Sequence, residues 1–167
     1  MLTTEPTTVR GVRVIELQEI AGANGRLVVA EQPAGLPFAA TRIFTLMNIP
    51  AAEMRGTHAH RQCEQFLICM RGSVTAAVDD GTRRDELILD RPTLGLYMPA
   101  LTWGGQYNYS PDAVLVVLAS DPYDAVDYIE DYNEFLTLVR ARARHETHST
   151  PDAEPASVFP AFSDPLS

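Results

Sequence analysis

The chain has 167 residues, and 13 basic residues against 22 acidic ones give it a net charge of −9. A chain of this length buries roughly 70% of the surface that it exposes when unfolded, which suits one domain with its own core. Every basic residue is Arg and none is Lys, which excludes Schiff-base chemistry, a pyridoxal-phosphate anchor and a Walker-type lysine. The acidic balance argues against nonspecific binding to nucleic acid or to anionic membranes.

Hydropathy and cysteine content indicate the cellular compartment in which the protein is expected. The longest apolar run, Ala113–Ala119, has seven residues, whereas a membrane-spanning helix needs about 20. Residues Met1–Arg10 contain Thr and Pro where a signal peptide has an apolar stretch. We therefore expect a cytoplasmic protein in which Cys63 and Cys69 are reduced thiols on strands.

Short apolar stretches alternate with turn residues between positions 12 and 119, a pattern typical of an all-β protein. The Asp80-Gly81 step is a hairpin signal. Many short strands with no helix between them predict a double-sheet jelly roll or a small barrel. The stretches expected to form strands are 12–17, 27–31, 41–49, 54–60, 66–70, 74–78, 87–89, 94–98, 103–109 and 113–119.

After residue 119 the spacing of the apolar and aromatic residues changes from that of a strand to that of a helix. Ser120-Asp121-Pro122 offers an N-cap and a proline near the first turn. Residues at helical spacing follow it, namely Tyr128, Tyr132, Phe135 and Val139. We expect one C-terminal amphipathic helix over about 121–143, which completes a domain over 1–144. Residues 145–167 hold four prolines, four acids and no basic residue, which predicts a flexible acidic tail.

Two histidines lie two positions apart in Arg55-Gly-Thr-His-Ala-His60. Residues two apart on a strand point to the same face, so we expect His58 and His60 side by side in the barrel interior, with Glu64 on that face. Imidazoles titrate near neutrality and suit general acid and base catalysis. Arg55 could face a developing oxyanion if Gly56 lets the strand bulge.

The spacing of His58, His60 and Glu64 resembles the first motif of the cupin superfamily. In metal-binding cupins a histidine of a second motif completes the ligand set, and the aligned position here is Gly104. Glycine has no side chain that can coordinate an ion, so we expect no metal and no other cofactor. A cupin enzyme that keeps a metal ion on His58, His60 and Glu64 stays open as an alternative.

A longer series of blocks resembles the nucleotide-sugar 3,4-ketoisomerases, cupin enzymes also called WxcM-like. The blocks lie in order between about 12 and 139: Arg55–His60, Gln65, Leu89–Pro92, Gly95–Pro99, Trp103, Val114–Ser120, Tyr123–Ile129, Tyr132 and Phe135. The resemblance implies a metal-independent jelly-roll homodimer with an active-site histidine pair, acting on dTDP-4-dehydro-6-deoxyglucose. It also implies an isomerase of unusual deoxysugar biosynthesis. Besides the metal-dependent cupin enzyme, a second alternative stays open, namely a non-catalytic module that binds sugar nucleotides.

The reaction that this resemblance implies suits the residues. Moving a ketone from C4 to C3 needs a base for the C3 proton, a partner for the charged C4 oxygen and a proton for C4, through an enediol(ate). We therefore predict that His58, His60 and Arg55 are catalytic. The predicted substrate-binding residues, chosen for ring stacking, diphosphate pairing or position in the blocks, are Arg42, Thr45, Gln65, Tyr97, Trp103 and Tyr107.

Positions 44 and 45 depart from the family pattern. Relatives commonly carry two aromatic residues there, one of them tyrosine, whereas this chain has Phe44 and Thr45. A missing hydroxyl on that strand could alter which face of the enediol is protonated, and therefore the configuration at C4 of the product.

Overall fold

The computed structural model describes residues 4–148. The strands are β1 (Thr4–Pro6), β2 (Arg13–Glu16), β3 (Gln18–Gly22), β4 (Gly25–Val29), β5 (Arg42–Met47), β6 (Ala59–His60), β7 (Gln65–Arg71), β8 (Val74–Asp79), β9 (Arg84–Leu89), β10 (Leu94–Met98), β11 (Trp103–Tyr107), β12 (Val114–Ala119) and β13 (Tyr128–Ile129). The helices are a 3₁₀-helix, η1 (Ala125–Asp127), and an α-helix, α1 (Tyr132–His148). Neither helix has the length and apolar content needed to cross a bilayer.

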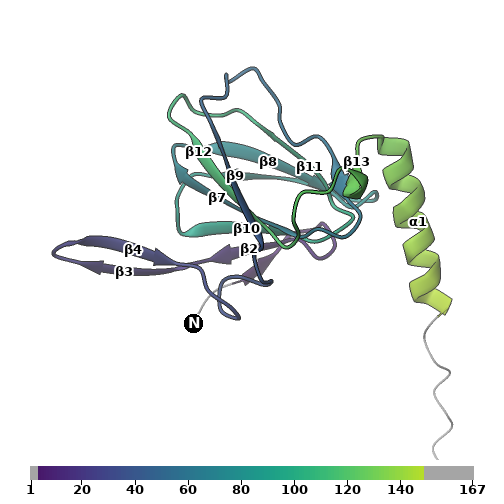
Figure 1. Ribbon diagram of the computed structural model, residues 1–167, viewed down its shortest axis with the longest axis horizontal. Helices are drawn as coiled ribbons and strands as arrows, with labels where there is room; N and C mark the ends of the chain where they lie inside the picture. Colours follow the sequence, from purple (N-terminus) through teal and green to yellow (C-terminus); the bar gives the residue numbers. More distant parts are fainter. Residues whose placement is uncertain (1–3, 149–167) are drawn as a thin grey trace, which may run out of the picture.

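Two antiparallel sheets form the body of the molecule. One has six strands in the order β1-β2-β10-β7-β12-β5, and the other has three in the order β11-β8-β9. β6 pairs with β13 beside them, and the hairpin of β3 and β4 projects away from the body (Figure 1). This arrangement confirms the predicted jelly roll.

The core fills the space between the two sheets. Alternate side chains of each strand point into it, as the pleat requires. In β7 these are odd-numbered residues such as Leu67 and Cys69, which face Val74, Ala76 and Val78 of β8. The even-numbered Phe66 and Ile68 point to the other face of the six-stranded sheet, where they pack on a second cluster. Strand β7 is therefore buried on both faces from Gln65 to Cys69, which explains the apolar run that begins at Phe66.

Strand β5 forms one edge of the six-stranded sheet, and its outer face is left open. Phe44 and Leu46 pack toward the core, while Ile43 and Met47 are 67% and 51% exposed. Met70 of β7 adds a third apolar side chain, 48% exposed, on the same outer face. We call Ile43, Met47 and Met70 the outer patch.

The C-terminal helix begins later than the sequence pattern predicts. It starts at Tyr132 and not at 121, because η1 and β13 precede it. The side chain of Asp124 caps η1 by accepting a hydrogen bond from the Val126 N–H at 2.9 Å. β13 then pairs with β6, opposite His60, so its backbone groups bond to a strand and not within a helix.

The helix also ends later than the domain boundary predicted after residue 144. Helix α1 continues to His148, and the remainder of the predicted tail lies outside the described residues. The buried face of α1, with Phe135 and Val139, packs on a small cluster with Ala59 and Ile129. The helix thus covers the end of the body where β6 and β13 lie.

Close packing between β10 and β7, on the face of the six-stranded sheet that carries Phe66, predicts the effect of a single methyl group. A Cβ on Gly95 of β10 would collide with the ring of Phe66, which is fully buried. We expect Gly95→Ala to lower the free energy of unfolding, measured by urea denaturation, by about 1–3 kcal/mol. Gly22→Ala is the matched control, since a Cβ there meets nothing within 4 Å. Equal stability of the two variants would contradict this packing.

Candidate functional site

A cavity of about 260 Å³ opens between the two sheets at the end of the body that α1 covers. Its apolar wall includes Leu67, Met98 and Val117, which belong to the core. Its polar and ionisable lining residues come from several elements and are Arg55, His58, His60, Cys63, Gln65, Thr102, Gln106 and Tyr128. The cavity therefore offers a mostly apolar floor with a small group of convergent polar side chains, as small-molecule sites do.

The two predicted histidines lie next to each other on this wall. The ring centroids of His58 and His60 are 5.0 Å apart and the rings are nearly perpendicular. The ring of Tyr128 contacts both, at 4.8 Å from His58 and 4.5 Å from His60. The predicted juxtaposition of the imidazoles is confirmed, and β13 supplies an aromatic neighbour that the sequence did not indicate.

His60 is held in one orientation by a carboxylate. Its Nδ1 lies 2.8 Å from Oδ2 of Asp127, and its Nε2 lies 3.0 Å from the side-chain nitrogen of Gln65. An ionised carboxylate can only accept, so Nδ1 carries the proton and Nε2 accepts from the amide of Gln65. Burial lowers the pKa of His60, and the hydrogen bond and charge of Asp127 oppose that effect. His60 is thus a neutral imidazole of fixed tautomer.

His58 is the freer of the two rings. Burial, and then the neighbouring His60, lower its pKa from the ordinary 6.5 to about 4. Within residues 4–148, no hydrogen bond engages either of its ring nitrogens. At neutral pH this side chain is therefore an uncharged base with a free nitrogen lone pair, on the wall of the cavity.

Arg55 reaches the cavity because the chain twists at Gly56. Gly56 has a φ of +67°, a left-handed conformation that favours glycine, and a Cβ there would collide with Gln106. The backbone of Arg55 pairs with that of Gln106 through two hydrogen bonds of 2.9 and 2.8 Å. The expected strand bulge is absent, since Gly56 lies outside the strands, but Arg55 still lines the cavity together with the histidines.

Glu64 lies elsewhere, contrary to the expectation from strand parity. Residues 61–64 form a bend between β6 and β7, so the alternation restarts and Gln65 takes the inward position. The carboxylate of Glu64 accepts a hydrogen bond from the hydroxyl of Tyr97. The metal-ligand set of His58, His60 and Glu64 is therefore not assembled in this fold, and the alternative built on it is wrong.

Two aromatic residues of β11 face away from the cavity. Trp103 packs against the rings of Tyr132 and Phe135 on α1, at 5.1 and 5.5 Å. Tyr107 lies beside Glu86, and their hydrogen bond raises the pKa of the tyrosine. The intervening positions of the strand face the cavity instead, and these are Gly104 and Gln106. Trp103 and Tyr107 are predicted to bind substrate, and strand parity places both outside the cavity that holds the histidines.

Thr45 and Tyr97 also lie outside the cavity. Thr45 is exposed on the outer face of β5, and its inward neighbour Phe44 lines the cavity. Tyr97 stacks near Phe38 on the outer side of the six-stranded sheet, with the guanidinium of Arg13 4.7 Å from its ring. Of the six residues predicted to bind substrate, only Gln65 is part of the cavity wall.

Arg42 lies next to that wall. Its guanidinium stacks over the ring of Phe44 at 5.3 Å and near the ring of Tyr123 at 5.8 Å. Its Nε is buried and, in the described part of the chain, has no hydrogen-bond partner. An unpaired, buried donor on a permanent cation is costly, so the arrangement favours an anionic ligand at this place.

Sequence patterns do not single out Asp127, Gln106 or Cys63. Asp127 lies in the helix expected over 121–143, Gln106 lies in the strand expected over 103–109, and Cys63 is expected to be a reduced strand thiol. Their one available signal was position within or near the blocks that resemble a known family. The contacts that define their roles join segments 64 or more residues apart for Asp127 and 51 apart for Gln106 and Arg55.

Comparison with known proteins gives one consistent result. Residues 10–140 match the family model described as FdtA, WxcM-like, C-terminal. A TDP-4-oxo-6-deoxy-alpha-D-glucose-3,4-oxoisomerase from Aneurinibacillus thermoaerophilus is 39% identical over 123 residues, which span 74% of this chain and 88% of that protein.

Solved structures agree with the sequence comparison. The TDP-quinovose 3,4-ketoisomerase WlaRB from Campylobacter jejuni superposes with a TM-score of 0.74 at 36% identity, over 77% of this chain and 99% of that one. A mutant of the 3,4-ketoisomerase QdtA from Thermoanaerobacterium thermosaccharolyticum, in complex with TDP-4-keto-6-deoxyglucose, gives 0.77 at 30% identity, over 81% and 98%. The chain therefore belongs to the WxcM-like, C-terminal (FdtA) family.

Proposed function

We propose that this protein is a sugar-nucleotide 3,4-ketoisomerase that converts a dTDP-4-keto-6-deoxyhexose to its 3-keto isomer in deoxysugar biosynthesis. The observation that carries the proposal is the pair of imidazoles, 5.0 Å apart, on the wall of a cavity that also holds Arg55. Membership of a family whose named relatives include 3,4-ketoisomerases supports it.

His58 is the base in this proposal. Its neutral ring takes the proton from C3, and the electron pair of that C–H bond becomes the new double bond of an enediolate. Charge develops on the C4 oxygen, and Arg55 stabilises it. The hydroxyl proton on the C3 oxygen passes to the C4 oxygen as the charge redistributes. The His58 imidazolium then returns its proton to C4, which leaves a ketone at C3 and a neutral base.

His60 and Asp127 position the site. The carboxylate of Asp127 fixes the tautomer of His60, and the His60 ring packs against His58 and limits its rotation. Gln65 completes the arrangement from β7 through Nε2 of His60. These contacts orient the His58 ring before the substrate arrives. Little reorganisation of the site is therefore needed during proton transfer.

Arg42 is proposed to bind the diphosphate of the substrate. Its stacked guanidinium and unpaired buried Nε, next to Phe44 on the cavity wall, offer a local cation in a chain whose net charge is −9. A sugar held among the histidines and a diphosphate on Arg42 would place the nucleotide toward the cavity mouth. We also propose that the enzyme works in the cytoplasm, where the free thiols of Cys63 and Cys69 would stay reduced.

Hydrogen exchange at C3 tests the reaction. Purified protein is incubated with dTDP-4-keto-6-deoxyglucose in heavy water, and the C3 signal and the 3-keto product are followed by NMR. We expect loss of the C3 proton signal and formation of the product, and a rate that is lower by roughly 10²- to 10⁴-fold in His58→Gln.

His145→Gln serves as the matched control, since His145 lies on α1 and does not line the cavity. It is expected to keep the rate of the unmodified protein. Absence of both exchange and product in the unmodified protein would contradict the proposed function. Ligand-induced thermal stabilisation without turnover would then favour the non-catalytic binding module.

We further propose that the protein is a homodimer whose second copy covers the outer patch. Ile43 and Met47 on the edge strand β5, with Met70 on β7, give the six-stranded sheet an exposed apolar outer face. The projecting hairpin carries its own exposed apolar residues, Ile20 at 51% and Leu27 at 57%. Two such surfaces on one chain suit reciprocal contact between identical copies, which also protects the edge strand.

Light scattering coupled to size-exclusion chromatography tests the dimer. The unmodified protein is expected at twice the 18.4 kDa mass of one chain, and Ile43→Glu at the mass of one chain, because a buried unpaired charge opposes association. Ile88→Glu is the matched control, since Ile88 is a strand residue 63% exposed on the other sheet. A monomeric unmodified protein, or a dimeric Ile43→Glu, would contradict this assignment.

A further inference from the structure

We propose that His60, Cys63 and Asp127 form a binding site for Zn²⁺, and that the bound ion inhibits the enzyme reversibly. The inhibitory effect rests on the proposed isomerase function, whereas the binding of the ion does not. The site uses one nitrogen, one sulfur and one oxygen ligand, and it shares two residues with the machinery that positions the histidine pair.

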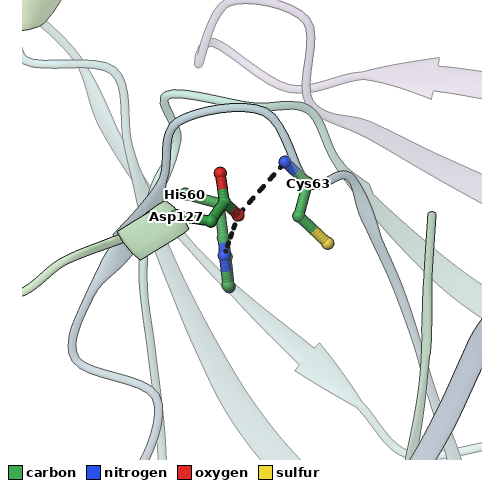
Figure 2. A group of neighbouring side chains, drawn as sticks. All are labelled: His60, Cys63 and Asp127. Atoms are coloured by element: carbon green, nitrogen blue, oxygen red, sulfur yellow. Dashed lines mark hydrogen bonds and ion pairs between the residues drawn. The ribbon is translucent and has the colours of Figure 1, made fainter. Parts of the chain in front are cut away.

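The geometry of the three side chains carries the inference. One ligand atom from each of them lies within 4.8 Å of the other two. Zn²⁺ binds imidazole nitrogen and carboxylate oxygen at about 2.0–2.2 Å and thiolate sulfur at about 2.3 Å. Ligand atoms around such an ion are therefore roughly 3–4 Å apart, close to the separation of these three side chains. Figure 2 shows the Asp127 carboxylate between the His60 ring and Cys63.

Burial supports the site as well. His60 is 5% exposed, Cys63 is 3% exposed, and Asp127 is partly buried. The only hydrogen bond that the described structure gives the Cys63 thiol is a long one of 3.4 Å, to the carbonyl of the adjacent Glu64. A buried thiol beside a histidine and a carboxylate, with no strong partner of its own, is well suited to a thiophilic borderline cation such as Zn²⁺.

Three protein ligands leave one tetrahedral position free for a water. His60 and Cys63 line the cavity and Asp127 lines a neighbouring pocket, so the ion would lie in the wall of the proposed active site. When Nδ1 of His60 binds the ion, the ring proton of His60 moves to Nε2. Cys63 binds as a thiolate, and its proton is released to the buffer. The ion thereby replaces the contact between His60 and Asp127 and reverses the tautomer that Gln65 faces, so the positioning of the histidine pair is lost.

The first measurement is Zn²⁺ binding to the full chain, free of affinity tags, by competition with a fluorescent chelator. We expect one tight Zn²⁺ per chain in the unmodified protein. Loss of a partner outside the ligand shell already weakens metal sites by about 10–100-fold, so Cys63→Ser is expected to bind at least about tenfold more weakly. Co²⁺ is the second probe, and a thiolate-to-metal absorption band is expected with the unmodified protein and not with Cys63→Ser.

Cys69→Ser is the matched control. Cys69 is also a free buried cysteine, but it belongs to the core, where its thiol donates to the carbonyl of Arg71 at 3.0 Å. Thermal unfolding confirms that both variants are folded, with Cys69→Ala in reserve if Cys69→Ser is not. We expect Zn²⁺ affinity of the Cys69 variant to equal that of the unmodified protein. Equal affinities of the Cys63 and Cys69 variants, or no Zn²⁺ binding by the unmodified protein, would overturn the site.

Turnover is measured separately, with and without Zn²⁺. The unmodified enzyme is expected to lose activity as the site fills and to regain it with EDTA, while the rate of Cys63→Ser, whatever its metal-free value, is expected not to change at the same Zn²⁺ concentration. Undiminished activity of the unmodified enzyme with the site filled would overturn the inhibition. Absence of turnover in metal-free protein that binds Zn²⁺ through Cys63 would refute the proposed function and support the site.

Discussion

The carboxylate of Asp127 holds the functional end of this molecule together. One of its oxygens accepts from Nδ1 of His60 at 2.8 Å and from the N–H of Cys63 at 3.3 Å, and the other accepts from the N–H of Gln62 at 2.8 Å. These bonds tie η1 to the bend between β6 and β7. The bend shifts the strand parity so that Gln65, and not Glu64, faces the cavity. A single partly buried acid thus sets both the local fold and the state of one imidazole.

The rest of the site depends on strands that are buried on one or both faces. Because side chains alternate along a strand, the inward residues of β5, β7, β10, β11 and β12 supply both the core and the cavity wall. The apolar surroundings that stabilise the fold also remove water from the histidines and lower their pKa values. Stability and chemistry therefore have the same physical source, which is the exclusion of water from the space between the sheets.

The sequence allowed accurate prediction of features that depend on local patterns. Most strands, the turn after β8 and the neighbouring His58 and His60 follow from periodicity and spacing. The helix start was wrong because the capping signal at Ser120-Asp121-Pro122 is local, whereas the pairing of β13 with β6 is not. The position of Glu64 was wrong for a related reason: the bend between β6 and β7 restarts the alternation of side chains, so Gln65 and not Glu64 faces the cavity. Contacts between distant segments, such as His60 with Asp127, leave no periodic trace in one sequence.

The proposed reaction depends on a fold that keeps His58 uncharged, as a base, at neutral pH. The most direct measurement is the pKa of its ring, from NMR titration of the histidine C–H signals, with His58→Gln to assign the signal. Since burial and His60 disfavour the charged ring, protonation should occur only as the pH falls through about 4. A midpoint at the ordinary value of 6.5 would contradict the account, because His58 would then be a solvated histidine and not a desolvated base.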